Sequence, residues 1–272
     1  QVYDLESARA FSAAAQAAGR RLRIHVKADT GMSRLGWLCD EGHRTEAADA
    51  IAAVCALPGL EAEGIYTHFA NADGDEAYTM GQFTRFLELL SELEGRGITF
   101  PIRHCAASAA VLKYPCTHLD MVRPGVALYG HYPDPSCEGL DGVGLRPVMA
   151  LKTRVASVKA VPAGTPVSYG CTHVLERDAE LAALTVGYAD GLPRLCSDRL
   201  EVLIRGQRAP IVGRVCMDMC MADATGLGAA PGDEVELFGE HLPVEDAAAL
   251  AGTIQYELLC AVSPRVPREY LN

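Results

Sequence analysis

Polar side chains that can move protons or hold charge stand where apolar, alternating segments of the N-terminal half end. They are Lys27, Asp29, His68, His104, Ser108 and Arg123. A guanidinium keeps its charge, so an arginine at the end of a buried segment needs an acceptor or a ligand. If the segments are strands of one parallel sheet, their carboxyl ends meet where chemistry gathers in such folds. The spacing predicts one shared site, although His68 taken alone could equally be a packed core histidine.

The C-terminal half twice places a tyrosine beside glycine, in "VSYG" at 167–170 and in "VGYADG" at 186–191. The ordinary interpretation is that Tyr169 and Tyr188 end strands, because tyrosine is common in β structure. The chemical interpretation is a phenol that acts as a base, which needs nearby cations because its ordinary pKa is about 10. Three arginines are candidates for that role: Arg34, Arg194 and Arg214.

The composition favours a small-molecule ligand. The 272 residues are 49% hydrophobic, which allows a large buried core and two domains. The formal net charge of −11 disfavours nucleic acid, whose phosphates this surface would repel. No run of about 18 apolar residues is present, so no membrane span is predicted.

The ten cysteines form no CxxC pair and no cluster with zinc-binding spacing, so we predict no metal site. In a chain of this size they are typical of reduced, mostly buried thiols in a cytoplasmic protein. The sulfur-rich stretch "GRVCMDMCMAD" at 213–223 is interpreted as a strand with alternating apolar faces. Soft-metal sites usually show tighter, repeated spacing of their ligands.

Helical and strand patterns alternate through the first half of the chain. Helices are predicted over residues 4–19, 41–59 and 80–97, and strands over residues 21–29, 61–69, 100–108 and 120–130. Such alternation is typical of an α/β fold in which helical crossovers join parallel strands, and we assign about four βα units to residues 1–143. Residues 144–272 contain short β-type runs separated by Gly, Pro and Asp, which indicates a mostly antiparallel β domain with a late helix.

Seven segments, in order from residue 25 to residue 268, resemble the alanine racemase family of pyridoxal-phosphate (PLP) enzymes. The segments are "HVKADTGMSRLG", "YTHFANAD", "MVRPGVALYG", "VSYG", "VGYADGLPR", "VGRVCMDM" and "IQYELLC…SPRVPR". The resemblance implies interconversion of L- and D-alanine for the bacterial cell wall, with PLP as the cofactor. It implies a (β/α)₈ barrel followed by a β domain, and a homodimer that takes an amino acid as its substrate.

The resemblance also assigns roles at the cofactor. Arg123 would hold the pyridine nitrogen of PLP, with His68 beside it. The phosphate would be bound by Ser108, Gly125, Val126 and Tyr256. Tyr169 would be one of two bases, reaching into the partner subunit's site, because a proton leaves one face of the substrate and returns on the other.

Further roles implied by the resemblance concern the substrate. The carboxylate region would be organised by Arg34, Met217 and Asp218. The entrance would be lined by Asp73, Tyr188, Arg194 and Arg214. Lys27 would be a support residue, often carbamylated in the family, that positions Arg34.

The chain departs from the family in its lysines. The second base of the family is the lysine that bonds to PLP, in a motif resembling "VKANAYGHG", and this chain contains no such stretch. Its only lysines are Lys27, Lys113, Lys152 and Lys159. We therefore expect the C-terminal half of a barrel followed by the β domain, lacking the N-terminal segment with the PLP lysine and inactive by itself.

Three alternatives stay open beside alanine racemase. A serine racemase of the same family is one, although relatives of that kind tend to replace the tyrosine found here at position 256. A decarboxylase of the same PLP fold type would carry a Gly-rich phosphate motif and a "CDG"-like loop, and neither is present. The last alternative is a truncated, non-catalytic chain that acts only as a dimer-forming module.

Overall fold

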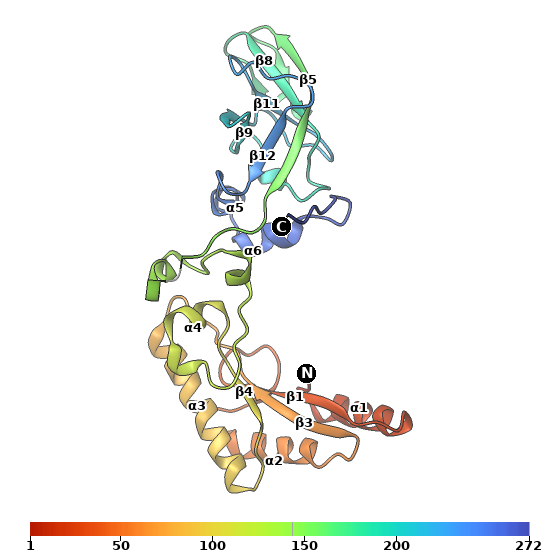
Figure 1. The fold of residues 1–272 in the computed structure, drawn as a ribbon, viewed down its shortest axis with the longest axis vertical. Coiled ribbons are helices and arrows are strands. Elements are labelled where there is room, and N and C mark those ends of the chain that lie inside the picture. Colours follow the sequence, from red (N-terminus) through yellow and green to blue (C-terminus); the bar gives the residue numbers. More distant parts are fainter. Residues whose placement is uncertain (143, 272) are drawn as a thin grey trace. The chain divides into compact units, whose positions relative to one another are not determined.

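The computed structural model describes residues 1–142 and 144–271, and the chain divides into two compact units, Gln1–Leu145 and Arg146–Asn272 (Figure 1). The boundary predicted after residue 143 falls at a position outside the described residues. Within the described part of the chain, none of the helices combines the length and apolarity that a bilayer crossing needs.

The first unit is built on a parallel sheet whose strands end side by side. The sheet has the order β2-β1-β3-β4, with β1 at Leu22–Asp29, β2 at Trp37–Leu38, β3 at Leu60–Tyr66 and β4 at Ile102–His104. The last residues are in register, Lys27 opposite Tyr66 and Tyr66 opposite His104. The predicted strands over 21–29, 61–69 and 100–108 are confirmed, and one edge of the sheet carries their polar ends.

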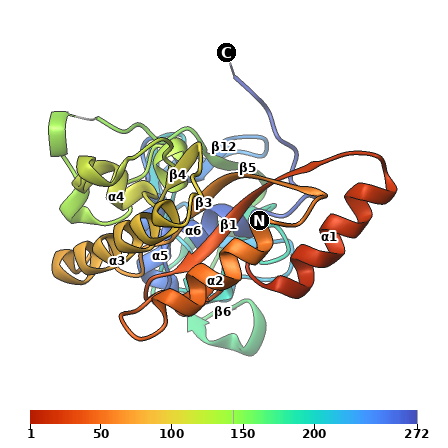
Figure 2. The same cartoon turned by 90° about the horizontal axis from the view of Figure 1, so that it is seen from below.

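Helices join these strands and begin at side chains that the sequence supplies. They are α1 at Leu5–Ala17, α2 at Arg44–Cys55, α3 at Glu76–Gly95 and α4 at Ser108–Lys113. The carboxylates of Asp4 and Asp75 accept the N–H groups of Ser7 and Tyr78, which would otherwise lack partners in the first turns of α1 and α3. Helix α2 lies between α1 and α3 (Figure 2).

The strand predicted over residues 120–130 is wrong. Arg123 forms only an isolated parallel bridge with Ala107, and residues Val126–Tyr129 form a 3₁₀ helix. Pro124 has no N–H to donate to a ladder, and Gly125 takes backbone angles of φ −101° and ψ −95°, outside the extended region. The bridge nevertheless fastens Arg123 to the chain that leaves β4, beside the strand ends.

The second unit is an antiparallel sheet with the order β10-β9-β12-β5-β8-β11 and a separate hairpin. The sheet strands are β5 at Leu151–Val161, β8 at Ala179–Leu184, β9 at Glu201–Ile204, β10 at Gln207–Pro210, β11 at Cys220–Asp223 and β12 at Glu234–Phe238. The hairpin pairs β6 (Pro166–Val167) with β7 (His173–Val174). Two helices follow, α5 at Val244–Ala251 and α6 at Gln255–Ala261.

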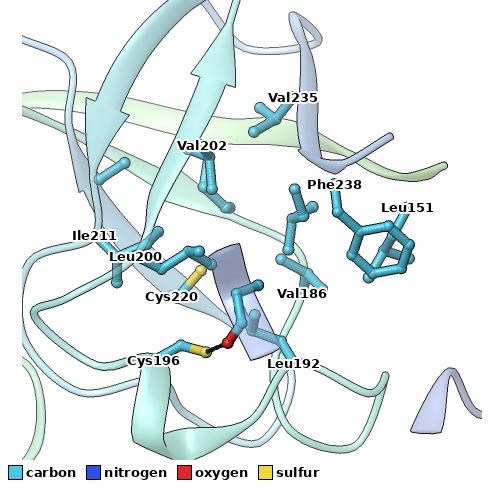
Figure 3. Close-up of a cluster of buried hydrophobic side chains, with 14 of the residues drawn as sticks. Leu151, Val186, Leu192, Cys196, Leu200, Val202, Ile211, Cys220, Val235 and Phe238 are labelled. Carbon is cyan, nitrogen blue, oxygen red and sulfur yellow. Dashed lines mark hydrogen bonds between the residues drawn. The ribbon is translucent and has the colours of Figure 1, made fainter. Parts of the chain in front are cut away.

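The hydrophobic core of the second unit accounts for one cysteine of the sulfur-rich stretch, Cys220. Figure 3 shows Cys196 and Cys220 among buried aliphatic side chains, and both thiols are fully buried. The interpretation of residues 213–223 as one strand is wrong, because only Cys220–Asp223 pair with β8. Residues 213–219 form a loop, closed by a hydrogen bond of 2.8 Å from Cys216 N–H to the carbonyl of Met219.

The junction between α1 and the start of β3 gives a test of the first unit. A Cβ added to Gly59 would lie 2.2 Å from the carbonyl oxygen of Ser12, whose Oγ also accepts the Gly59 N–H. Gly59→Ala must push α1 away, and we expect the free energy of unfolding in urea to fall by about 1–3 kcal/mol.

The control is Gly81→Ala in α3, where an added Cβ meets nothing within 4 Å. Alanine favours helix over glycine, so this variant should gain up to about 1 kcal/mol. Equal effects of the two substitutions would contradict the packing that we describe.

Candidate active site

Arg123 lies at the polar edge of the first sheet and is held there by neutral acceptors. Its Nη1 donates to Nδ1 of His104 over 2.5 Å. Its Nη2 donates to the carbonyl oxygens of Thr67 (2.9 Å) and Cys105 (3.2 Å). Nδ1 of His68 lies 3.3 Å from the same nitrogen. The guanidinium is therefore fixed in orientation although no carboxylate among the described residues pairs with it.

The site carries an excess of positive charge. Arg123 and Lys27 both lie over the ring of Tyr66, at 5.1 and 5.0 Å from its centroid. Among the residues that the structure describes, Arg123 and Arg34 form no ion pair. A positive centre of this kind, half-buried at Arg123 and without an ion pair, fits an anionic or electron-rich ligand.

Two imidazoles beside this charge stay neutral. Burial, followed by the charge of Arg123, lowers the pKa of His68 to about 4 and the pKa of His104 to about 3. Both effects disfavour a second proton on either ring. At neutral pH each histidine therefore offers one donor and one acceptor.

The loop after β1 is shaped by one carboxylate. Oδ1 of Asp29 accepts the N–H groups of Gly31, Met32 and Ser33, each over 3.0 Å. Three such bonds hold the loop in a tight turn that presents Arg34, whose side chain is exposed. The sequence predicted a polar role for Asp29, and the structure shows that the role is to shape this loop.

Lys27 is buried beneath the same loop. Its Nζ donates to the carbonyl of Ala28 over 3.0 Å, and Gly36 packs so closely that an added Cβ would lie 2.5 Å from the Lys27 carbonyl. Burial lowers the pKa of the Lys27 amine to about 8, and the nearby Asp29 carboxylate opposes that change. An appreciable fraction of this amine is therefore neutral near pH 8.

Ser108 joins two helix N-termini on the other side of Arg123. It begins α4, and its buried Oγ accepts the N–H groups of Gly125 (2.8 Å) and Ala127 (3.3 Å). Val126 begins the adjacent 3₁₀ helix. Asp73 lies apart from this group, in the exposed loop before α3, where its carbonyl accepts Nζ of Lys113 over 2.8 Å.

In the second unit, Tyr169 is presented at the surface by a strained turn. The preceding Ser168 has φ +62° and ψ −170°, a region that only glycine visits readily. Its Oγ donates to the carbonyl of Arg214 over 2.8 Å, and Tyr169 is 71% exposed. A Cβ on Gly213 would lie 2.8 Å from Cβ of Ser168, so this glycine lets the two loops meet.

Met217 and Tyr188 belong to two loops that are paired through their backbones. Tyr188 N–H donates to the carbonyl of Cys216 over 3.0 Å, and Ala189 N–H donates to that of Met217 over 2.8 Å. Gly187 makes this possible, since an added Cβ would lie 2.3 Å from Cys216 O. The side chains of Met217 and Asp218 are exposed beside this contact.

The remaining predicted residues of the second unit lie near its helices. Arg194 is exposed and begins a 3₁₀ helix that ends at Cys196. Tyr256 stands in the first turn of α6.

The structure thus gathers the predicted site residues into two groups, one in each unit. The first contains Lys27, Arg34, His68, Ser108, Arg123, Gly125 and Val126. The second contains Tyr169, Arg214, Met217, Asp218 and Tyr188. Sequence reasoning missed Tyr66, Ser168 and Asp190. The only signal for Tyr66 was its place just before the Thr-His pair at residues 67–68, and nothing in the sequence marks the strain at Ser168.

Asp190 holds the Tyr188 loop. Its Oδ2 accepts Gly187 N–H over 2.8 Å, and its Oδ1 lies 3.0 Å from Nε of Arg265. Because Asp190 is buried, this ion pair ties the loop to the C-terminal segment.

Comparison with known proteins gives one consistent result. The family description "Alanine racemase, N-terminal domain" matches residues 1–133, and "Alanine racemase, C-terminal domain" matches residues 148–270. The alanine racemase of Desulforamulus reducens is 49% identical over 274 residues, which cover 100% of this chain and 73% of that protein.

Solved structures agree with this result. The alanine racemase of Clostridium difficile 630 superposes with a TM-score of 0.92 at 37% identity, covering 99% of this chain and 70% of that one. The alanine racemase of a D-cycloserine-producing Streptomyces lavendulae gives 0.91 at 39% identity, covering 100% and 72%.

The fold therefore belongs to the class that joins an N-terminal, barrel-like α/β domain to a mostly antiparallel β domain. Within this class the chain belongs to the alanine racemase family. The expectation that the chain lacks the N-terminal part of the family is not confirmed, because the N-terminal domain matches from residue 1.

The lowered pKa of Lys27 predicts a pH-dependent stability. Between about pH 8 and the ordinary value of 10.5, the unfolded chain keeps a proton on Lys27 that the folded chain has lost. The contribution of Lys27 to the free energy of unfolding therefore rises with pH across that window. Relative to Lys27→Met, we expect the unfolding free energy of the unsubstituted protein to rise by about 2 kcal/mol between pH 7 and pH 9.5.

Urea titrations in CO₂-free buffer measure this difference, with Lys159→Met on the exposed face of β5 as the control. A difference for Lys27→Met that does not change with pH would show that the buried amine has an ordinary pKa.

Proposed function

We propose that the protein is a PLP-dependent racemase that interconverts L- and D-alanine. The observation that carries the proposal is the half-buried Arg123 guanidinium, fixed by neutral acceptors and without an ion pair among the described residues. Close relatives that match the whole chain are named alanine racemase, which supports this substrate. Supply of D-alanine to the cell wall is consistent with that activity.

The residues of the first unit fit PLP. Its ring nitrogen is an acceptor for Arg123, and because a guanidinium does not give up its proton, the ring nitrogen stays unprotonated. We assign the phosphate to Ser108, Gly125, Val126 and Tyr256. The starts of α4 and of the 3₁₀ helix at Val126–Tyr129 lie together, joined by the hydrogen bond from Gly125 N–H to Ser108 Oγ. His68, neutral and 3.3 Å from Arg123, would lie beside the ring without competing for its charge.

Bound PLP supplies a conjugated ring that accepts the electron pair left on the α-carbon when its proton departs. We propose that Tyr169 takes or returns that proton on one face of the substrate. The exposed, strained turn at Ser168 supports this role, because it presents the phenol away from its own unit. We infer that the protein is a homodimer in which Tyr169 serves the partner subunit's site.

The substrate carboxylate is assigned to Arg34, Met217 and Asp218. Exposure of Arg34 on the loop held by Asp29 supports its part in this assignment. Asp73, Tyr188, Arg194 and Arg214 are proposed to line the entrance. Lys27, with its lowered pKa, is proposed to be carbamylated: its neutral amine would attack dissolved CO₂ and release one proton, leaving an anion beside Arg34.

We further propose that the lysine that bonds to PLP is not among the four in this chain. Lys113 donates to the Asp73 carbonyl and to Ser136, and Lys152 pairs with Glu234 at 2.7 Å. Lys159 is exposed on β5. Lys27 is buried against a backbone carbonyl, in the support position that the family gives it.

The ten cysteines are all free within the described residues, which supports a reducing compartment and the proposal that the protein works in the cytoplasm.

Tyr169→Phe tests the proposed base. The variant keeps the ring but loses the acidic proton, so we expect racemisation to fall by about 10²–10⁴-fold with PLP binding retained. The assay converts L-alanine to D-alanine in ²H₂O. Circular dichroism measures the rate of racemisation, and deuterium at the α-carbon measures proton exchange on each face of the substrate. Tyr3→Phe, at another exposed tyrosine, is the control and should be silent. Full activity in Tyr169→Phe would remove the phenol from the mechanism.

Borohydride reduction tests the assignment of the lysine. The protein with added PLP is reduced with borohydride, digested and mapped by mass spectrometry. We expect no phosphopyridoxyl group on Lys27, Lys113, Lys152 or Lys159. Label on Lys27 at one group per chain would instead make the buried amine the PLP lysine.

A further inference from the structure

A row of four side chains runs from the surface of the first sheet to the half-buried guanidinium of Arg123. Oε2 of Glu63 lies 3.4 Å from Nε2 of His25. Nδ1 of His25 lies 2.7 Å from Nε2 of His104, and Nδ1 of His104 lies 2.5 Å from Nη1 of Arg123. The first two contacts join different strands, β3 to β1 and β1 to β4, and the third joins β4 to Arg123, so the row depends on the sheet register.

The chemistry of the row allows one arrangement of protons. Arg123 can only donate, so Nδ1 of His104 must accept, and the proton of that ring is on Nε2. Nε2 of His104 then donates to Nδ1 of His25, which leaves the proton of His25 on Nε2, facing Glu63. A proton on either Nδ1 would set two donors against each other. The burial that lowers the pKa of His104 to about 3 agrees with a neutral ring.

The backbone is adapted to place His25 in this row. The pairing of β1 with β3 shifts register between Ile24 and His25, a bulge of the kind that redirects a side chain. Gly64 stands opposite His25, and a Cβ there would lie 2.5 Å from its Nδ1. Two residues after Gly64 on β3, the ring of Tyr66 stacks on His104 with centroids 4.9 Å apart and planes 3° from parallel.

We propose that Glu63, His25 and His104 form a positioning relay, which orients Arg123 for the ligand by holding His104 in a single neutral tautomer. The proposal rests on PLP binding at Arg123. Without an acceptor at His25, the proton of His104 is free to move to Nδ1, where it would face the guanidinium and break the contact. His25 and Glu63 touch neither substrate nor cofactor and act only through His104.

The relay makes a prediction about tautomers that needs no cofactor. In protein labelled with ¹⁵N-histidine, long-range ¹H–¹⁵N spectra at pH 7 should show the Nε2–H form for both His25 and His104, assigned by their variants. The Nδ1–H form at His104 in the unsubstituted protein would overturn the proposal.

Two variants of His25 distinguish a role in hydrogen bonding to His104 from a role in packing alone. His25→Leu removes the acceptor, whereas His25→Asn returns an amide oxygen near the position of Nδ1. We expect His25→Leu to lose the single His104 tautomer and to weaken PLP binding by about tenfold, as for one lost hydrogen bond. His25→Asn should restore both.

A second pair uses half-exposed and exposed positions of β3, where folding is not at risk. Glu63→Leu should shift the tautomers of His25 and His104 in the direction of His25→Leu, and Glu61→Leu on the same strand should not. An unchanged His104 tautomer and unchanged PLP affinity in both His25→Leu and Glu63→Leu would overturn the proposal. Failure of the unsubstituted protein to bind PLP would refute the proposed function instead, because the tautomers are read without PLP.

Discussion

The first unit depends on one constraint: a half-buried guanidinium that has no carboxylate partner among the described residues. Arg123 cannot lose its charge, and its hydrogen bonds go to carbonyl oxygens and to neutral imidazole. A carboxylate in the same place would hold the arginine equally well, but it would cancel the charge that attracts a ligand. The parallel sheet solves this by ending three strands together, so that Thr67 and Cys105 offer carbonyls just past the strands.

The same unpaired charge sets the chemistry of its neighbours. Burial and Arg123 keep His68 and His104 neutral, and burial keeps the amine of Lys27 close to its titration near pH 8. The carboxylate of Asp29 accepts hydrogen bonds from three backbone N–H groups. It therefore shapes the Arg34 loop without neutralising Arg123. The site is therefore strongly positive while the chain as a whole is acidic, which favours a small anionic ligand over a polyanion.

In the second unit, local backbone strain, and not an unpaired charge, positions the proposed catalytic side chain. Ser168 adopts a backbone conformation that costs of order 1–3 kcal/mol, and its bond to the Arg214 carbonyl and the close approach of Gly213 maintain it. The ion pair of Asp190 with Arg265 similarly fixes the Tyr188 loop. A rigid sheet with a large aliphatic core carries both loops, so their exposed side chains are presented in defined positions.

The sequence by itself determined most elements and the family. Alternating polarity marked β1, a capping aspartate marked α1 and an amphipathic pattern marked α3, because these signals act over a few neighbouring residues. It also identified Arg123 and Tyr169 as unusual. Tertiary structure decided the rest: that residues 120–130 are not a strand, that residues 213–219 form a loop, and that His25 lies within 2.7 Å of His104. These facts depend on register and on contacts between residues up to 79 positions apart, which no local pattern encodes.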